Sequence, residues 1–246
     1  MRNIKPFLYL YQLYVYIILL PLFVLFTLIF GTLGALLTII VNERVGSLMG
    51  VLWAKFNSYI TPMFVKVIGK DKINKKKSYV IVANHQSMYD IFVVYGWMPV
   101  DFKWVMKIEM RTYPMIGYSC DKMGHVFIDR SNQVAALESI NSARDKIKDG
   151  TSIMFFPEGT WSKDGKLLDF KKGAFRLALD MGLPVLPVTI VNIRKILPSD
   201  KFAIFPGSAK MVIHDPISID DYNKENMDEL MERARESIQK GLDDYS

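Results

Sequence analysis

The chain has 246 residues, enough for one α/β domain with a membrane anchor but too few for two large domains. Lysine and arginine outnumber aspartate and glutamate by 31 to 25, and the resulting net charge of +6 is too small to indicate a nucleic-acid partner. Cys120 is the only cysteine, which excludes an internal disulfide framework and a cluster of thiolate metal ligands.

The first predicted element is a membrane anchor. No charged residue interrupts the run from Phe7 to Val41, which is longer than the roughly 20 apolar residues that cross a bilayer as a helix. The run is also too long for the apolar core of a secretory signal, so it is expected to be retained. Bends at Pro21 and at the pair Gly31 and Gly34 leave two arrangements open, a tilted span and a half-inserted hairpin.

Basic residues gather on the C-terminal side of this run. After Arg44 and Lys55 comes a cluster formed by Lys66, Lys70, Lys72, Lys75, Lys76 and Lys77. This excess predicts that the body of the protein lies on the cytoplasmic face, with the lysines near anionic lipid. Residues 42–70 have apolar positions at helical spacing, so we expect an amphipathic segment that lies on the membrane. The anchoring helical segment is therefore predicted to cover residues 1–70 and the globular domain residues 71–246.

Apolar runs of strand length alternate with helical patterns in the rest of the chain. The expected strands are 79–83, 126–128, 152–156, 185–191 and 209–213. The expected helices are 134–148, 173–181 and the terminal segment 227–242. Such alternation is typical of an α/β domain, so we expect a mostly parallel central sheet flanked by helices.

A first polar motif follows the strand at 79–83 and reads Asn84-His85-Gln86-Ser87-Met88-Tyr89-Asp90. On a regular helix His85 and Asp90 would not share a face. They can meet if His85 lies in the loop after the strand and Asp90 in the first turn of the next helix, which Ser87 can cap. The carboxylate would then fix the tautomer of the imidazole and stabilise its protonated form, as a general base requires. An ordinary capping acid beside a loop histidine is the alternative.

A second motif ends an apolar strand with Phe156-Pro157-Glu158-Gly159-Thr160. Proline and glycine there predict a sharp turn at the carboxyl end of a parallel strand, where open α/β sheets bind ligands. Gly159 leaves room for a ligand near the backbone, and the N–H groups around Thr160 are placed to hold an anion. A surface turn with a solvated Glu158 is the alternative.

With these motifs the chain resembles the membrane-associated glycerolipid acyltransferases, specifically the 1-acylglycerol-3-phosphate (lysophosphatidate) acyltransferases, over residues 65–215. The four blocks of that family occur in order, as Asn84 to Asp90, Gly124 to Arg130, Phe156 to Thr160 and Leu183 to Val188. The resemblance implies that Arg130 binds the phosphate of the acceptor and that Lys107 lines the site. It also implies that residues 71–246 form an acyltransferase catalytic domain.

Trp161 departs from the family pattern, in which an arginine follows the threonine of the third block. An indole cannot clamp a phosphate as a guanidinium does. Two explanations stay open. Either Lys107, Lys163 or Lys172 supplies the missing charge, or the acceptor is not lysophosphatidate itself.

The motifs and the resemblance together imply a membrane enzyme that moves a fatty acyl group from acyl-CoA or acyl-carrier protein to the free hydroxyl of a lysophospholipid. The expected acceptor is 1-acyl-glycerol-3-phosphate and the expected product phosphatidic acid. His85 is the expected general base and Asp90 the residue that orients it. The head group is expected to contact Arg130, Glu158, Gly159, Thr160 and Lys107.

The thioester is a co-substrate, and no other cofactor is expected. A metal site is not expected either, because the three histidines lack the spacing of metal ligands. The expected partners are the phospholipid bilayer, the acyl donor and the lysophospholipid, and nucleic acid is not among them. Two rival functions are acylation of glycerol-3-phosphate or another lysolipid, and non-catalytic lipid binding at a membrane surface. The second needs no base, so His85 and Asp90 argue against it.

Overall fold

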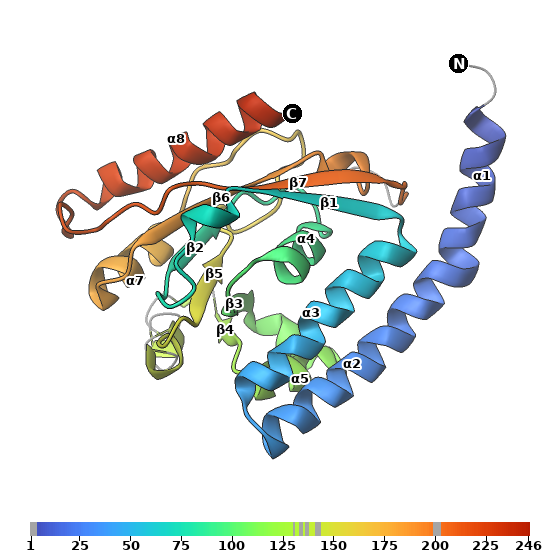
Figure 1. Ribbon diagram of the computed structural model, residues 1–246, viewed down its shortest axis with the longest axis horizontal. Coiled ribbons are helices and arrows are strands. Elements are labelled where there is room, and N and C mark those ends of the chain that lie inside the picture. Colours follow the sequence, from blue (N-terminus) through green and yellow to red (C-terminus); the bar gives the residue numbers. More distant parts are fainter. Residues whose placement is uncertain (1–3, 130, 133–134, 136–137, 141–143, 199–202) are drawn as a thin grey trace.

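A central β-sheet organises the protein (Figure 1). The computed structural model describes residues 4–129, 131–132, 135, 138–140, 144–198 and 203–246. Within these residues seven strands form one sheet in the order β1-β7-β6-β2-β5-β3-β4. The strands are β1 (Met63–Ile68), β2 (Val80–Ala83), β3 (Phe102–Lys107), β4 (Val126–Ile128), β5 (Ser152–Phe155), β6 (Val185–Val191) and β7 (Gly207–Ile213). Neighbouring strands are parallel except for the antiparallel pair β6 and β7, which confirms the mostly parallel α/β fold.

Helices cover both faces of the sheet (Figure 1). They are α1 (Ile4–Tyr14), α2 (Leu20–Ile40), α3 (Glu43–Ile60), α4 (Asp90–Trp97), α5 (Ile116–Lys122), α7 (Gly173–Met181) and α8 (Met227–Tyr245). Because side chains alternate along a strand, β2 serves two cores. Val80 and Val82 lie in the core beneath α7 and α8, whereas Ile81 and Ala83 lie in the core shared with α3 and α4. Every residue of β2 is buried, as expected for a central parallel strand.

Most expected elements are present, but one segment was misinterpreted and one strand was not expected. The interpretation of 42–70 as one amphipathic segment is wrong at its end, because β1 occupies Met63–Ile68 and pairs in parallel with β7. Strand β3 was not expected from the sequence. The expected helix 134–148 falls partly on residues outside the described ranges. Within those ranges 135 and 138–140 are α-helical, and Arg144–Lys146 form a 3-10 helix instead.

The expected anchor is a long helix that runs through α1, a π-helical turn at Val15–Leu19, and α2. Its segment Phe7–Ile40 is long and apolar enough to cross a membrane by length and composition. Residues near the start of this helix and just beyond its end nevertheless contact the same globular body. Near its start, the Gln12 side chain donates a hydrogen bond of 2.7 Å to the carbonyl of Ile204. Beyond its end, Glu43 of α3 pairs with Lys103 of β3 at 3.1 Å.

The outer face of this helix and of α3 is apolar and exposed. It carries the exposed side chains of Leu10, Leu13, Ile17, Leu25, Ile29, Leu36, Ile40, Leu48, Leu52, Phe56 and Tyr59. A contiguous apolar surface of this kind is typical of a membrane or protein interface rather than of a water-exposed surface.

Candidate active site

The expected site residues gather at one edge of the sheet. Strands β2, β5, β3 and β4 are parallel neighbours, so their carboxyl ends meet there. His85 follows β2, Glu158 follows β5, and Lys107 is the exposed last residue of β3. Arg130, the expected phosphate ligand after β4, lies outside the described residues. The edge therefore has the position at which open α/β sheets bind ligands.

His85 and Asp90 are in direct contact. Nδ1 of His85 lies 2.8 Å from Oδ2 of Asp90, and the Asp90 side chain is completely buried. The same Oδ2 accepts hydrogen bonds from the backbone N–H groups of Gln86, at 2.6 Å, and Ser87, at 2.8 Å. Asp90 is the first residue of α4 and His85 lies in the loop before it, so the arrangement expected from the spacing is present. With Nδ1 held by the carboxylate, Nε2 is the ring nitrogen left to take a proton from a ligand.

Aromatic side chains fix the plane of the His85 ring. Phe156 stacks on it with ring centroids 4.0 Å apart and an interplanar angle of 10°. Trp161 approaches with an angle of 89° and a centroid distance of 6.0 Å. The His85 side chain is only 13% exposed. The imidazole is thus held in one orientation, as a general base would require, and Trp161 forms part of its surroundings.

Backbone contacts that the sequence did not reveal hold the His85 loop. The amide of Asn84 donates to the carbonyl of Ile190 at 2.9 Å and accepts from the N–H of the same residue at 2.7 Å, which ties the loop to β6. The N–H of Ser162 donates to the carbonyl of His85 at 2.8 Å. The asparagine before the histidine was visible in the sequence, but its partner lies about a hundred residues away.

Glu158 is buried and bridges two backbone segments. Its Oε1 accepts the N–H of His85 at 2.7 Å and its Oε2 accepts the N–H of Leu168 at 2.8 Å. Burial raises the pKa of this carboxyl to about 7, against the opposing effect of these two hydrogen bonds. A head group would have to compete with the two backbone bonds for the carboxyl oxygens. In the structure Glu158 therefore positions the backbone of His85.

The turn after Glu158 differs in detail from the expected anion site. Gly159 has a φ of +75°, as its lack of a side chain allows, and its N–H donates to the carbonyl of Phe156 at 3.0 Å. Thr160 beside it is exposed. The ammonium of Lys171 lies 3.1 Å from where a Cβ on Gly159 would be. Lys171 is thus a cation at the turn that sequence reasoning missed, because it follows the motif by eleven positions.

Lys172 and His125 are engaged with other parts of the protein. Lys172, one possible substitute for the missing arginine, pairs with Asp228 of α8 at 2.8 Å. His125 is buried and bonded to the Tyr95 hydroxyl at 3.0 Å, and burial together with nearby lysine charges lowers its pKa to about 3. Both ring nitrogens of His125 are engaged in the core, because Nδ1 also accepts the N–H of Trp104 at 3.2 Å.

Comparisons with known proteins agree with this arrangement. A family described as Acyltransferase matches residues 64–191. A 1-acyl-sn-glycerol-3-phosphate acyltransferase of Chlamydomonas reinhardtii is 34% identical over 78% of this chain and 56% of that protein. A chloroplastic protein of the same name from Arabidopsis thaliana is 33% identical over 78% of this chain and 52% of its own length. The chain therefore spans about half the length of these curated relatives.

A solved structure is similar over nearly the whole chain. The 1-acyl-sn-glycerophosphate acyltransferase PlsC from Thermotoga maritima superposes with a TM-score of 0.74 and 26% sequence identity. The match covers 91% of this chain and 95% of that one.

Proposed function

Because this chain belongs to the acyltransferase family, we propose that it transfers a fatty acyl group from a thioester to the free hydroxyl of a lysophospholipid. The acceptor proposed is 1-acyl-glycerol-3-phosphate, the substrate named for its relatives, and the product is phosphatidic acid. The observation that carries the proposal is the contact between His85 and the buried Asp90 at the ligand-binding edge of the sheet. A binding module would have no use for an oriented base.

The proposed reaction is a direct displacement. Nε2 of His85 takes the proton of the acceptor hydroxyl while the hydroxyl oxygen forms a bond to the thioester carbonyl carbon. Asp90, bonded to Nδ1, stabilises the imidazolium that results. As the carbon–sulfur bond breaks, the imidazolium returns the proton to the thiolate, so the products are an ester and a free thiol. The stacking of Phe156 keeps the ring in place through both proton transfers.

The acceptor head group is proposed to lie beside His85, between the carboxyl ends of β5 and β3. Cations within reach of that position are Lys107 at the end of β3 and Lys171 over the turn at Gly159. The expected ligand Arg130 comes two residues after β4 in the sequence and lies outside the described residues. The turn residues Gly159 and Thr160 complete the proposed head-group site, and Glu158 serves it by holding the backbone of His85.

The membrane arrangement follows from the docked helix. Gln12 near the start of the helix Phe7–Ile40 and Glu43, three residues beyond its end, both contact the globular body. The two ends of the helix therefore cannot lie on opposite sides of a bilayer that the body does not enter. We infer that α2 and α3 lie in one leaflet as a hairpin, with the catalytic domain on the cytoplasmic face. In sealed vesicles, an Asn42→Cys, Cys120→Ser variant should react with an impermeant thiol reagent from the same side as Ser246→Cys, Cys120→Ser. If the two cysteines reacted from opposite sides of the vesicle membrane, the helix would span the bilayer.

Trp161 favours one further acceptor class. Its indole stands beside the base, where the family pattern has an arginine, so a lysolipid with a head group other than phosphate is the second candidate. Thiol release from a long-chain acyl-CoA, measured with a panel of acceptors, separates the two. We expect release that depends on lysophosphatidate. If thiol were released only with another lysolipid or with glycerol-3-phosphate, that compound would replace lysophosphatidate as the proposed acceptor. The absence of acceptor-dependent thiol release from every thioester would overturn the proposed function.

A further inference from the structure

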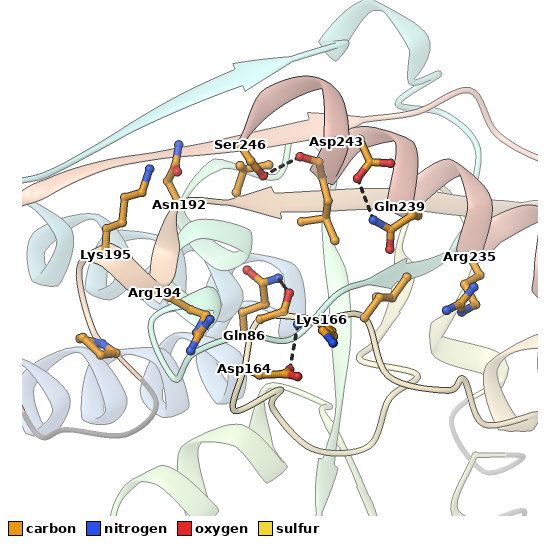
Figure 2. Close-up of a pocket in the computed structure, with 15 residues that line it drawn as sticks. Gln86, Asp164, Lys166, Asn192, Arg194, Lys195, Arg235, Gln239, Asp243 and Ser246 are labelled. Carbon is orange, nitrogen blue, oxygen red and sulfur yellow. Dashed lines mark hydrogen bonds between the residues drawn. The ribbon is translucent and has the colours of Figure 1, made fainter.

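A second site lies at the same edge of the sheet, beneath α8. An open cavity of about 810 Å³ lies between the loop after β5, the turn after β6 and the C-terminal half of α8. Figure 2 shows side chains from all three segments converging there. We call this cavity the α8 pocket. Its cationic lining residues are Lys166, Arg194, Lys195 and Arg235. The volume falls in the roughly 300–1,000 Å³ range of small-molecule and cofactor sites.

The topology of the sheet explains why a pocket forms here. Strands β2 and β6 are parallel neighbours, but the chain leaves them in opposite directions. From β2 the chain passes through α4 to β3, which lies on the β5 side of β2. From β6 it passes to β7, which lies on the opposite side, away from β2. Such a divergence opens a crevice beyond the carboxyl ends of the two strands, which is where α/β sheets bind ligands. The α8 pocket occupies this crevice.

The charge of the pocket favours an anion. Four cationic side chains line it against two side-chain carboxylates, and one of the four cations, Arg235, also pairs with Glu232 at 3.4 Å. Asp164 accepts hydrogen bonds from the hydroxyl of Ser162 at 3.0 Å and from the N–H of Lys166 at 3.0 Å. Asp243 accepts from the Gln239 amide at 2.9 Å. Several cations around one cavity are typical of sites for phosphate groups.

Arg194 is held in place on the pocket wall by the loop after β5. Its Nη2 donates to the carbonyl of Lys163, which fixes the side chain against the loop after β5. Its Nε is buried and has no hydrogen-bond partner among the described residues, although a buried donor normally has one. Gly165 has a φ of +88°, and a side chain there would collide with the guanidinium. The loop therefore makes room for an arginine whose inner nitrogen still lacks an acceptor.

The pocket is next to the base but on the other face of the sheet. Gln86 follows His85 in sequence, lines the pocket and donates to the carbonyl of Gly165 at 2.8 Å. In Figure 2 Gln86 is seen between Arg194 and Lys166. His85 itself stacks on Phe156, which packs against the core shared with α3 and α4. A ligand in the pocket can thus approach His85 from the α8 side, away from the exposed apolar helices.

We propose that the α8 pocket binds the phosphate groups of a coenzyme A thioester, with the pantetheine arm running past Gln86 to place the thioester carbonyl beside His85. The inference rests on the proposed acyl transfer and assigns its donor. The acceptor then reaches the base from the face of the membrane helices and the donor from the face of α8. No bond is made or broken in the pocket, whose cations serve only to bind.

The kinetic test changes one charge at a time on the pocket wall. Arg235→Gln and Arg194→Gln should each raise the KM for acyl-CoA about tenfold, because each removes a charged hydrogen bond to phosphate, while kcat and the KM for the acceptor stay within about twofold. Arg233→Gln is the matched control, since Arg233 lies on the same helix, bonds to the Tyr222 hydroxyl and is not a lining residue. An unchanged KM for acyl-CoA in both pocket variants would overturn the proposal.

A binding measurement separates this inference from the function on which it rests. The probe is the bisphosphorylated adenosine half of coenzyme A, titrated calorimetrically into the full chain in detergent with no acyl donor or acceptor present. Wild type and Arg233→Gln should bind it equally, and Arg194→Gln at least tenfold more weakly. Pocket-dependent binding without any turnover would reject the acyl transfer and keep the pocket. Turnover with acyl-carrier protein alone, and no probe binding, would reject the pocket and keep the transfer.

Discussion

Replacing Asp90 by asparagine tests the orienting carboxylate without changing the size of the side chain. Oδ2 of Asp90 accepts three hydrogen bonds, from Nδ1 of His85 and from the N–H groups of Gln86 and Ser87. An amide oxygen can keep the backbone bonds, but it carries no charge to stabilise the imidazolium. At 2.8 Å and an effective dielectric constant of about 20, that attraction is on the order of 6 kcal/mol.

The expected loss in turnover follows from this magnitude. General base catalysis is worth roughly a hundredfold to ten-thousandfold, which sets the limit to what Asp90→Asn can remove. We expect kcat to fall by at least about a hundredfold, with little change in the KM for the acceptor, because buried Asp90 does not reach the head group. Thiol release measures both constants. The control is Asp220→Asn, an exposed acid in a remote turn. A kcat within about threefold of wild type would refute the role given to Asp90.

Three further predictions concern stability, measured by urea unfolding in detergent. Glu158→Gln should lower the free energy of unfolding by about 1–3 kcal/mol, because the new amide nitrogen would face the backbone N–H of either His85 or Leu168. An unchanged unfolding midpoint would contradict this. Glu43→Gln should lower the free energy of unfolding by about 3 kcal/mol, because the ammonium of Lys103, which is only 2% exposed, loses its carboxylate partner. A free energy of unfolding equal to that of wild type would show that the pair is dispensable. Burial lowers the pKa of His125 to about 3, below the value near 6.5 in the unfolded chain, so the unfolded state binds the extra proton as pH falls. Wild type should therefore lose up to about 1.4 kcal/mol per pH unit between pH 6 and 4 through this residue, and His125→Gln should lose less over the same interval; equal slopes would refute the assignment.

The elements that the sequence predicts well are those with a strong local signal. Strands β2, β5 and β6 are continuous apolar runs bounded by turn residues, and all lie at the centre of the sheet. Strand β1 was misread because its alternating pattern, with Phe64 exposed, also suits an amphipathic segment. What makes it a strand is its pairing with β7, more than a hundred residues later.

Strand β3 illustrates a second limit. Two lysines in its six residues argue against a buried strand, yet Lys103 is buried because Glu43 and the carbonyl of Met123 satisfy its ammonium. Such partners come from distant segments and have no sequence signature. The α8 pocket was missed for the same reason, since Arg194 and Arg235 belong to different elements and only the fold brings them together.

The candidate site was predictable in its chemistry but not in its detail. The spacing of His85 and Asp90 allowed one geometry, a loop followed by a helix start, and the structure has it. The part played by Glu158 could not be foreseen, because its hydrogen-bond partners are backbone N–H groups that leave no trace in residue type. Lys171 was overlooked because it approaches the turn only after the loop folds back.

The most direct test of His85 as the base is the formation of product on vesicles. Isotopically labelled acyl-CoA would be supplied to wild type and to His85→Ala on vesicles that contain lysophosphatidate, with labelled phosphatidic acid measured by mass spectrometry and folding checked by circular dichroism. Wild type should form phosphatidic acid and free coenzyme A in equal amounts. His85→Ala, folded like wild type, should be at least about a hundredfold slower. Phosphatidic acid formed by His85→Ala at the wild-type rate would contradict a base at this position.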